Sequence, residues 1–304
     1  MIPIHLYTVS TSGLPGPEKP QFTAHFTGAR RRAGALRGMI GAMAAARLVL
    51  LCLLAAACAA NAAAPQCSAR SGPRTAALVE LYTSEGCDSC PPADRWLSSL
   101  FASGYSASQV VPLALHVDYW DYIGWKDPYA KRQFSARQHR MARLGRATLV
   151  YTPQVLLQGR DFRGWATDAF ATMVAQINAR PARAALALTI RSIGPSGADV
   201  DLGADLADAA LRDEAAVYVA AYENKLASDV RAGENRGRRL EHDFVVREWL
   251  GPVAFGADGR VAQRRTLPLL PEADPAQSGV AAFVQDRRTG EVLQALMLPA
   301  CGTH

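Results

Sequence analysis

The chain of 304 residues has a formal net charge of +6, with 33 Lys and Arg against 27 Asp and Glu. Six of the basic residues and one acid precede Pro65, so the remaining chain carries 27 basic and 26 acidic residues. Because a near-neutral chain lacks the concentrated basic surface that binds phosphates, this balance argues against a nucleic-acid partner.

Residues 1–64 have the pattern of a leader. Arg47 is followed by an apolar run from Leu48 to Ala60 and then by small residues, which is the order of a secretory signal peptide. The apolar run is short for a membrane-spanning helix. We therefore expect cleavage near Ala62 to Ala64 and a periplasmic or secreted protein, bound to a membrane only by an uncleaved leader or by lipidation. Residues 1–38 fit no part of the signal, and we interpret them as an over-called start.

Strand-like and helix-like segments alternate over residues 70–182. The order β-α-β-α-β-β-α predicts a layered α/β domain. The expected strands are Ala76–Tyr82, Val110–Val117, Pro153–Leu157 and Asp161–Trp165, and the expected helices are Pro92–Phe101, Tyr129–Leu144 and Asp168–Ala179.

Cys87-Asp88-Ser89-Cys90 lies between the first expected strand and the first expected helix. A helix N-terminus favours a thiolate, so we expect Cys87, nearer solvent, to attack and Cys90 to resolve. Asp88 opposes the thiolate by like-charge repulsion, which favours a reductase or isomerase over a strong oxidant. Cys90 precedes Pro91 and is therefore biased away from helical dihedral angles. We expect the helix to begin at Pro92 rather than directly after Cys90.

Two further polar residues are candidates for this site. Glu80, on the first strand, is either the proton acceptor for Cys90 or a carboxylate that faces solvent or pairs with an Arg. His116 ends the second strand, at the edge where open α/β sheets place their sites. It either completes a metal site for Cu(I) or Zn with the two cysteines, or it is a core histidine bonded to Asp118 or to backbone.

The segment that follows His116 is rich in aromatic residues. Trp120, Tyr122 and Trp125 stand among acidic residues close to the edge that holds the cysteines. They are expected either to form a substrate-facing lip or to cover the top of the sheet.

Residues 183–304 have a different texture, since short alternating strands are separated by Gly, Pro and Asp turns. This spacing predicts an all-β immunoglobulin-like sandwich domain. Four of the six cysteines follow the predicted cleavage site. Once Cys87 and Cys90 are paired, Cys67 and Cys301 remain, and an even number of cysteines favours a structural disulfide between them. The alternative is that one of the two is a third redox thiol or links a partner.

Three long motifs carry a resemblance to a known family. Residues 79–94, 116–128 and 151–159 resemble those of the domain of unknown function 1223 family, exported bacterial proteins with a thioredoxin-like fold. The match is firmest over residues 75–180. In the thioredoxin superfamily a loop with a cis-proline faces the cysteine pair, so the resemblance implies that role for Thr152 and Pro153. It supplies no substrate.

These patterns favour an exported thiol–disulfide oxidoreductase, leaning toward reduction or isomerisation. It would act through Cys87 and Cys90 on protein thiols or disulfides, and no cofactor is expected. The alternative is a thioredoxin-fold binding protein or Cu(I) metallochaperone that uses Cys87, Cys90 and His116.

Overall fold

The computed structural model describes residues 67–194, 197–268 and 272–301, all within one compact unit that spans residues 64–304. The predicted leader of residues 1–64 and its cleavage site lie outside the described residues. The periplasmic or secreted location inferred from them stays a prediction. No helix in the described part is long and apolar enough to cross a membrane.

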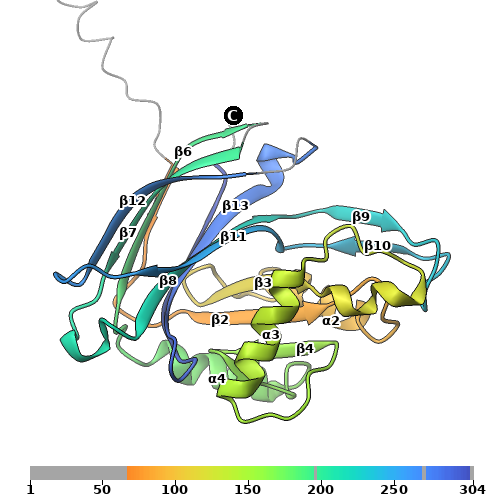
Figure 1. The fold of residues 1–304 in the computed structure, drawn as a ribbon, viewed down its shortest axis with the longest axis horizontal. Coiled ribbons are helices and arrows are strands. Elements are labelled where there is room, and N and C mark those ends of the chain that lie inside the picture. The colour runs from red at the N-terminus through yellow and green to blue at the C-terminus, as the bar shows by residue number, and fades with distance from the viewer. Residues whose placement is uncertain (1–66, 195–196, 269–271, 302–304) are drawn as a thin grey trace, which may run out of the picture. The chain divides into compact units, whose positions relative to one another are not determined.

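An eight-stranded mixed sheet forms the centre of the fold, with the strand order β14-β13-β8-β11-β3-β2-β4-β5 (Figure 1). β2 and β3 are parallel, β3 and β11 are parallel, and all other neighbours are antiparallel. The strands are β2 Ala77–Thr83, β3 Val110–His116, β4 Gln154–Leu157, β5 Arg160–Asp161, β8 Ala215–Glu223, β11 Val245–Ala254, β13 Ser278–Asp286 and β14 Val292–Pro299.

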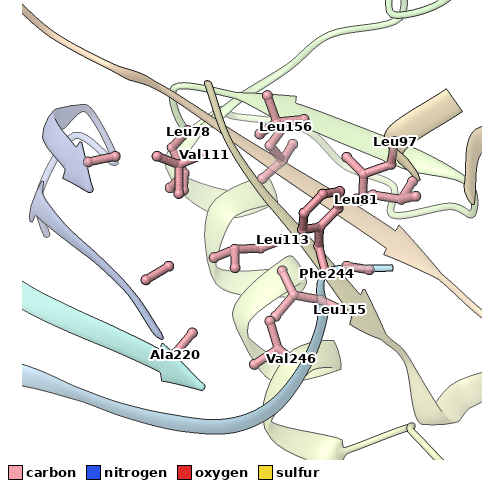
Figure 2. Close-up of a cluster of buried hydrophobic side chains, with 14 of the residues drawn as sticks. Leu78, Leu81, Leu97, Val111, Leu113, Leu115, Leu156, Ala220, Phe244 and Val246 are labelled. Carbon is pink, nitrogen blue, oxygen red and sulfur yellow. The ribbon is translucent and has the colours of Figure 1, made fainter. Parts of the chain in front are cut away.

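Helices α2 (Pro91–Ser99), α3 (Arg132–Leu144) and α4 (Asp168–Asn178) pack against β2 and β3. The short 3-10 helix η1 (Asp118–Ile123) follows β3 directly. Their apolar residues meet the sheet in one continuous core, part of which Figure 2 shows. This core joins Leu81 and Leu97 to Phe244 and Val246, residues far apart in the sequence.

A second sheet of four antiparallel strands packs against the face of β8, β13 and β14 that the first core does not cover. Side chains alternate along β8, so that Tyr218 and Ala220 lie in the first core while Val217 and Val219 lie in a second. Both faces of this strand are therefore buried. The four strands are β1 Cys67–Arg70, β6 Ala185–Gly194, β7 Gly197–Asp205 and β12 Arg260–Leu267.

A separate two-stranded sheet, β9 (Leu226–Asp229) with β10 (Arg239–His242), packs against α2. Neither strand is predicted from the sequence. Each is only four residues long, and the segment between them is rich in Arg and Gly, so neither shows a clear alternating pattern.

The fold is mixed α/β and dominated by sheet, but the predicted boundary at residue 183 does not separate two compact units. Strand β11, from the second predicted domain, continues the sheet of the first: Val245 pairs with Ala114, whose N–H donates to Phe244 at 2.8 Å. Because β3 gains a hydrogen-bonded neighbour, the edge that it would otherwise expose is covered.

Helix α2 also begins earlier than predicted. It starts at Pro91, directly after Cys90, whose φ of −75° and ψ of −40° are helical. Proline is well suited to the first turn because its φ is already helical and its missing N–H needs no partner there. The backbone N–H groups of Ala93 and Asp94 donate to the Cys90 carbonyl and hold that residue in the helical conformation.

Candidate functional site

The two cysteines lie where β2 ends and α2 begins. Cys90 Sγ donates a hydrogen bond to Cys87 Sγ across 2.7 Å, and both thiols are free. Cys87 is 1% exposed and Cys90 is fully buried, so both thiols are covered, while Asp88 and Ser89 between them are exposed. A partner therefore reaches Cys87 only if its local cover moves.

The surroundings of the two sulfur atoms separate their roles. The hydrogen bond from Cys90, helped by Ser89 and Thr152 against the opposing effect of burial, lowers the pKa of Cys87 to about 6. Burial, followed by the adjacent Cys87 sulfur, raises the pKa of Cys90 well above its usual value. Cys87 is therefore the thiolate near neutral pH, and Cys90 is the thiol that donates to it.

The loop before β4 faces the cysteine pair, as the resemblance implies. The Thr152–Pro153 peptide bond is cis, and the Thr152 carbonyl oxygen lies 3.9 Å from Cys87 Sγ. The Trp120 indole N–H donates to Thr152 Oγ1 at 2.7 Å, and Gln138 Nε2 donates to the Tyr151 carbonyl at 2.9 Å. Side chains from η1 and α3 thus hold this loop in place.

The three aromatic residues predicted as a lip have different surroundings. Trp120 and Trp125 are half-buried, and their indole N–H groups donate to Thr152 and to Glu85 Oε2 respectively, the latter at 2.8 Å. Tyr122, by contrast, is 83% exposed. The two tryptophans brace the loops on either side of the cysteines, and only Tyr122 is freely presented to a partner.

A segment from the C-terminal half of the chain also contacts the cysteine loop. Asn235 is fully buried, and its Nδ2 donates to the carbonyl oxygens of Glu85 at 2.9 Å and Cys87 at 2.8 Å. Glu234 Oε2 accepts the Asp88 N–H at 3.0 Å. Neither residue is assigned a role from the sequence, because the contact joins positions nearly 150 residues apart.

Gly233, which precedes this pair of residues, is the local signal in the sequence. Its φ is +75°, and a Cβ placed there would lie 3.0 Å from Ile123 Cδ1. A glycine followed by Glu and Asn inside an Arg-rich stretch thus marks a turn that packs closely against η1.

Glu80 does not face Cys90. Its fully buried carboxylate pairs with Arg137 of α3, at 2.5 Å from Nε and 3.0 Å from Nη2. The Arg137 guanidinium also lies over the rings of Tyr218, Trp249 and Phe283. Of the two alternatives for Glu80, the structure shows the pairing with an Arg, and the role of proton acceptor for Cys90 is wrong.

Asp94 is the buried acid beside Cys90. It lies one helical turn later, its N–H donates to the Cys90 carbonyl at 3.1 Å, and its negative charge contributes to the raised pKa of the Cys90 thiol. Burial raises the pKa of Asp94 itself, against the opposing charges of His242 and His116. In the sequence it resembles an ordinary first-turn acid, and its i, i+4 spacing from Cys90 is the signal that could have identified it.

His116 is a core histidine, but its partner is neither Asp118 nor backbone. Its Nδ1 lies 2.7 Å from Asp127 Oδ2, whereas Asp118 Oδ1 accepts from Ser135 Oγ. Burial acts to lower the pKa of His116, but the Asp127 carboxylate outweighs it and the pKa is raised. Among residues 67–194, 197–268 and 272–301, no three His, Cys, Asp or Glu side chains are placed to hold a metal ion. The predicted alternative site of Cys87, Cys90 and His116 thus gains no support.

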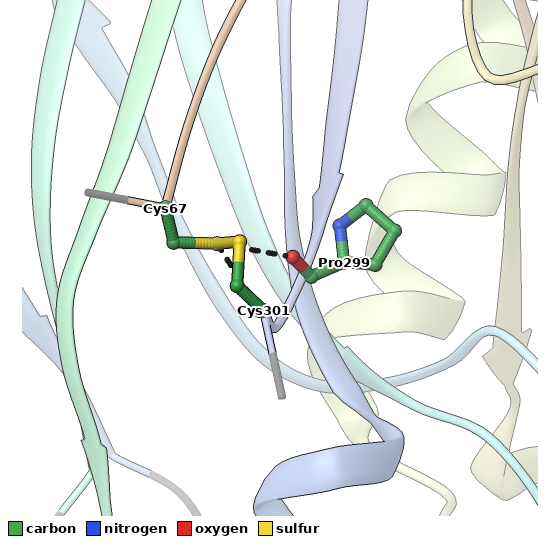
Figure 3. Close-up of a disulfide and its surroundings, with 3 residues drawn as sticks. All are labelled: Cys67, Pro299 and Cys301. Carbon is green, nitrogen blue, oxygen red and sulfur yellow. Dashed lines mark hydrogen bonds between the residues drawn. A yellow bond between two sulfur atoms is a disulfide. The ribbon is translucent and has the colours of Figure 1, made fainter. Parts of the chain in front are cut away.

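The other two cysteines of the described residues form a disulfide beside the β14 edge of the central sheet. Cys67 at the start of β1 is joined to Cys301, two residues after β14, with their Cα atoms 5.5 Å apart (Figure 3). This is the pairing that the sequence predicts. Because it lies away from the Cys87–Cys90 pair, it acts as a structural staple.

A family model described as "Protein of unknown function (DUF1223)" matches residues 78–285. The chain belongs to this family. The matched range of this DUF1223 member contains the cysteine pair, the cis-proline loop, Asn235 and His242. No curated protein sequence matches the chain.

Two solved structures resemble this DUF1223 protein. A crystal structure of an Agrobacterium tumefaciens protein, solved as a structural genomics target, is 24% identical with a TM-score of 0.54, and the match covers 77% of this chain and 98% of that one. HBP35 of Porphyromonas gingivalis is 14% identical with a TM-score of 0.57, and the match covers 75% of this chain and 76% of that one. At these identities the two structures show similarity of fold alone.

Proposed function

We propose that the protein is an exported thiol–disulfide oxidoreductase that acts on protein partners and uses Cys87 as the attacking thiolate. The observation that carries the proposal is the Cys90 thiol donating to Cys87 Sγ at 2.7 Å, which supports a thiolate with a pKa of about 6. A further support is the loop of Thr152 and Pro153 beside the pair. We propose that residues 70–182 form a thioredoxin-like arrangement around these parts.

The chemistry is a two-step exchange. The Cys87 thiolate attacks one sulfur of a partner disulfide and forms a mixed disulfide, while the other partner sulfur leaves as a thiolate. Cys90 then loses its proton and attacks Cys87 Sγ, which forms the Cys87–Cys90 disulfide and frees the partner. Two electrons pass from the cysteine pair to the partner. Asp94, the buried carboxylate next to Cys90, takes the role of proton acceptor that the sequence analysis gives to Glu80.

The pKa of Cys87 supports reduction or isomerisation over strong oxidation. Strongly oxidising cysteine pairs have an attacking thiol with a pKa of about 3.5, because the stabilised thiolate makes their disulfide unstable, whereas reductants have values of about 7. The pKa of about 6 for Cys87 is nearer to the second group. Since Cys87 is 1% exposed, we further propose that partner binding displaces the exposed residues Asp88 and Ser89.

Reduction of insulin disulfides by dithiothreitol, followed by turbidity, tests the proposal. We expect catalysis by the protein, loss of catalysis in Cys87→Ser, and a trapped mixed disulfide in Cys90→Ser. The double variant Cys67→Ser/Cys301→Ser is the matched control, because it removes two cysteines outside the site and is expected to remain active. Insulin reduction no faster than with dithiothreitol alone would contradict the proposal.

A further inference from the structure

A small pocket behind the cysteine pair connects buried polar groups to the surface. It has a volume of about 150 Å³ and opens between the start of α2 and β10. Two of its lining residues, Asp94 and His242, are buried, at 6% and 3% exposure. Its walls are formed by Pro91, Asp94, Arg95, Arg239, Leu240, Glu241 and His242.

Two polar atoms at the base of this pocket have no hydrogen-bond partner in the described part of the chain: Asp94 Oδ1 and His242 Nδ1. Asp94 Oδ2 lies 3.9 Å from His242 Nδ1. Buried polar atoms are nearly always satisfied, by protein or by water, so an unsatisfied acid beside an unsatisfied imidazole calls for an explanation. A polar pocket of this size admits water.

The neighbouring Glu85 bears on which nitrogen of His242 carries the hydrogen. Glu85 Oε1 lies 3.1 Å from His242 Nε2. A hydrogen on Nε2 would serve this contact, because a carboxylate oxygen accepts, and Nδ1 would then be the acceptor on the side of Asp94. The imidazole is thus oriented to receive a proton from the Asp94 side.

We propose that His242 takes up, by way of Asp94, the proton that Cys90 releases in the resolving step, and passes it to water through the pocket between α2 and β10. This inference rests on the proposed function, since it concerns the second step of the same exchange. It adds a residue and a route that the cysteine pair alone does not indicate.

The resolving step moves one proton and forms one disulfide. The Cys90 S–H bond breaks and its proton goes to the Asp94 carboxylate, while the Cys90 thiolate attacks Cys87 Sγ and the partner leaves as a thiolate. Asp94 then gives the proton to His242 Nδ1, and His242 returns it to water in the pocket. Asp94 and His242 are left as they began, and the two electrons pass only between the cysteines and the partner.

Charged and titratable groups face His242 from every element packed against it. Glu85 and Asp94 approach from two sides, and the rings of His116 and Tyr129 lie 4.9 Å and 5.7 Å from the His242 ring. An imidazolium formed in transit therefore lies between two carboxylates. The other charged groups are Asp127 bonded to His116, Arg247 over Tyr129, and Arg95, Arg239 and Glu241 along the pocket.

Rapid mixing with dithiobis-nitrobenzoate separates the two steps, in a full chain that carries Cys52→Ser and Cys58→Ser and is reduced only at Cys87 and Cys90. The first released thionitrobenzoate reports attack by Cys87, and the second reports resolution by Cys90. In His242→Gln we expect the first phase to stay within about twofold of wild type and the second to slow about tenfold or more, as expected for loss of a proton-transfer group. His139→Gln, an exposed histidine of α3, is the matched control and is expected to change neither phase.

A second variant distinguishes proton transfer from structural support. In His242→Ala we expect the slowed second phase to be accelerated by added imidazole, which enters through the pocket, whereas wild type is not accelerated. A second phase of wild-type rate in His242→Gln, or a slow second phase in His242→Ala that imidazole does not restore, would overturn the inference. Absence of the first phase in wild type would instead overturn the proposed function, and with it this inference.

Discussion

At the scale of single residues, one shared hydrogen bond lowers the pKa of one cysteine and contributes to raising the pKa of the other. Cys90 is the donor, so its thiol stabilises the Cys87 thiolate while its own pKa is raised by burial and by the neighbouring sulfur. Asp88, which the sequence analysis expects to oppose the thiolate, is exposed, and its N–H is held by Glu234. The exposed position weakens its repulsion, because water screens the charge.

Removing the Cys90 donor should therefore raise the pKa of Cys87. In Cys90→Ala we expect the midpoint of alkylation rate against pH to move up from about 6 toward the value of about 8.5 of a free thiol. Cys90→Ser retains a hydroxyl donor and should move the midpoint less. Iodoacetamide kinetics on the reduced proteins give both midpoints, and equal midpoints in wild type and Cys90→Ala would contradict the hydrogen-bond account.

Sequence reasoning found the reacting residues better than the groups that support them. Cys87 and Cys90 are identifiable because their chemistry depends on local spacing, and Pro153 is identifiable through the resemblance to a known family. The two alternatives for Glu80 could not be separated, because a strand pattern does not show which face of the sheet the residue occupies. The i, i+4 spacing places Asp94 beside Cys90, but its burial depends on what covers the start of α2, which is β10, a strand about 150 residues later.

At the scale of elements, the segment before β10 holds the cysteine loop through side-chain hydrogen bonds to its backbone. Asn235 satisfies two carbonyl groups of that loop, those of Glu85 and Cys87, from a fully buried position. A buried carbonyl that loses its donor costs about 1–3 kcal/mol. This contact therefore ties the position of the redox loop to the C-terminal half of the chain.

We expect Asn235→Ala to destabilise the fold by about 2–4 kcal/mol, since two buried carbonyl groups lose their donor at once. The same change should alter the alkylation rate of Cys87, because the loop that carries it is released. Arg236→Ala is the matched control, since this neighbour is exposed. Urea unfolding and alkylation kinetics measure the two effects, and an Asn235→Ala protein that behaves like Arg236→Ala in both would contradict the assigned role.

Most individual helices and strands could be predicted within a few residues, but their assembly could not. The apolar periodicity of Asp168–Asn178 or Ala215–Glu223 is a local property and is visible in the sequence. The pairing of β11 with β3 joins residues more than 130 positions apart and leaves no local trace. For that reason the sequence suggested two separate domains where the structure has one shared sheet.

At the scale of the whole molecule, two hydrophobic cores share the strands β8 and β13. Alternate residues of each strand face opposite cores, as Ala281 and Ala282 of β13 do. Loosening the second core therefore also disturbs the sheet that carries the cysteine pair. The Cys67–Cys301 disulfide lies at this second core and joins β1 to the residue two positions after β14.

The disulfide spans a sequence separation of 234 residues, so its removal should release a large loop in the unfolded state. We expect Cys67→Ala/Cys301→Ala to lower the free energy of unfolding by about 2–5 kcal/mol. The two phases of the cysteine exchange should stay within about twofold of wild type, since this bond lies outside the site. Urea unfolding of the double variant checks the first expectation, and unchanged stability would show that the staple contributes nothing.

The reduction potential of the Cys87–Cys90 pair tests the central claim most directly. Equilibration of the full chain with defined glutathione buffers, followed by mass analysis of the two thiols, should give a reversible two-electron transition between about −270 mV and −120 mV, nearer the reducing end. A pair that stays fully reduced in every buffer, or a Cys87 that never exchanges, would contradict the account.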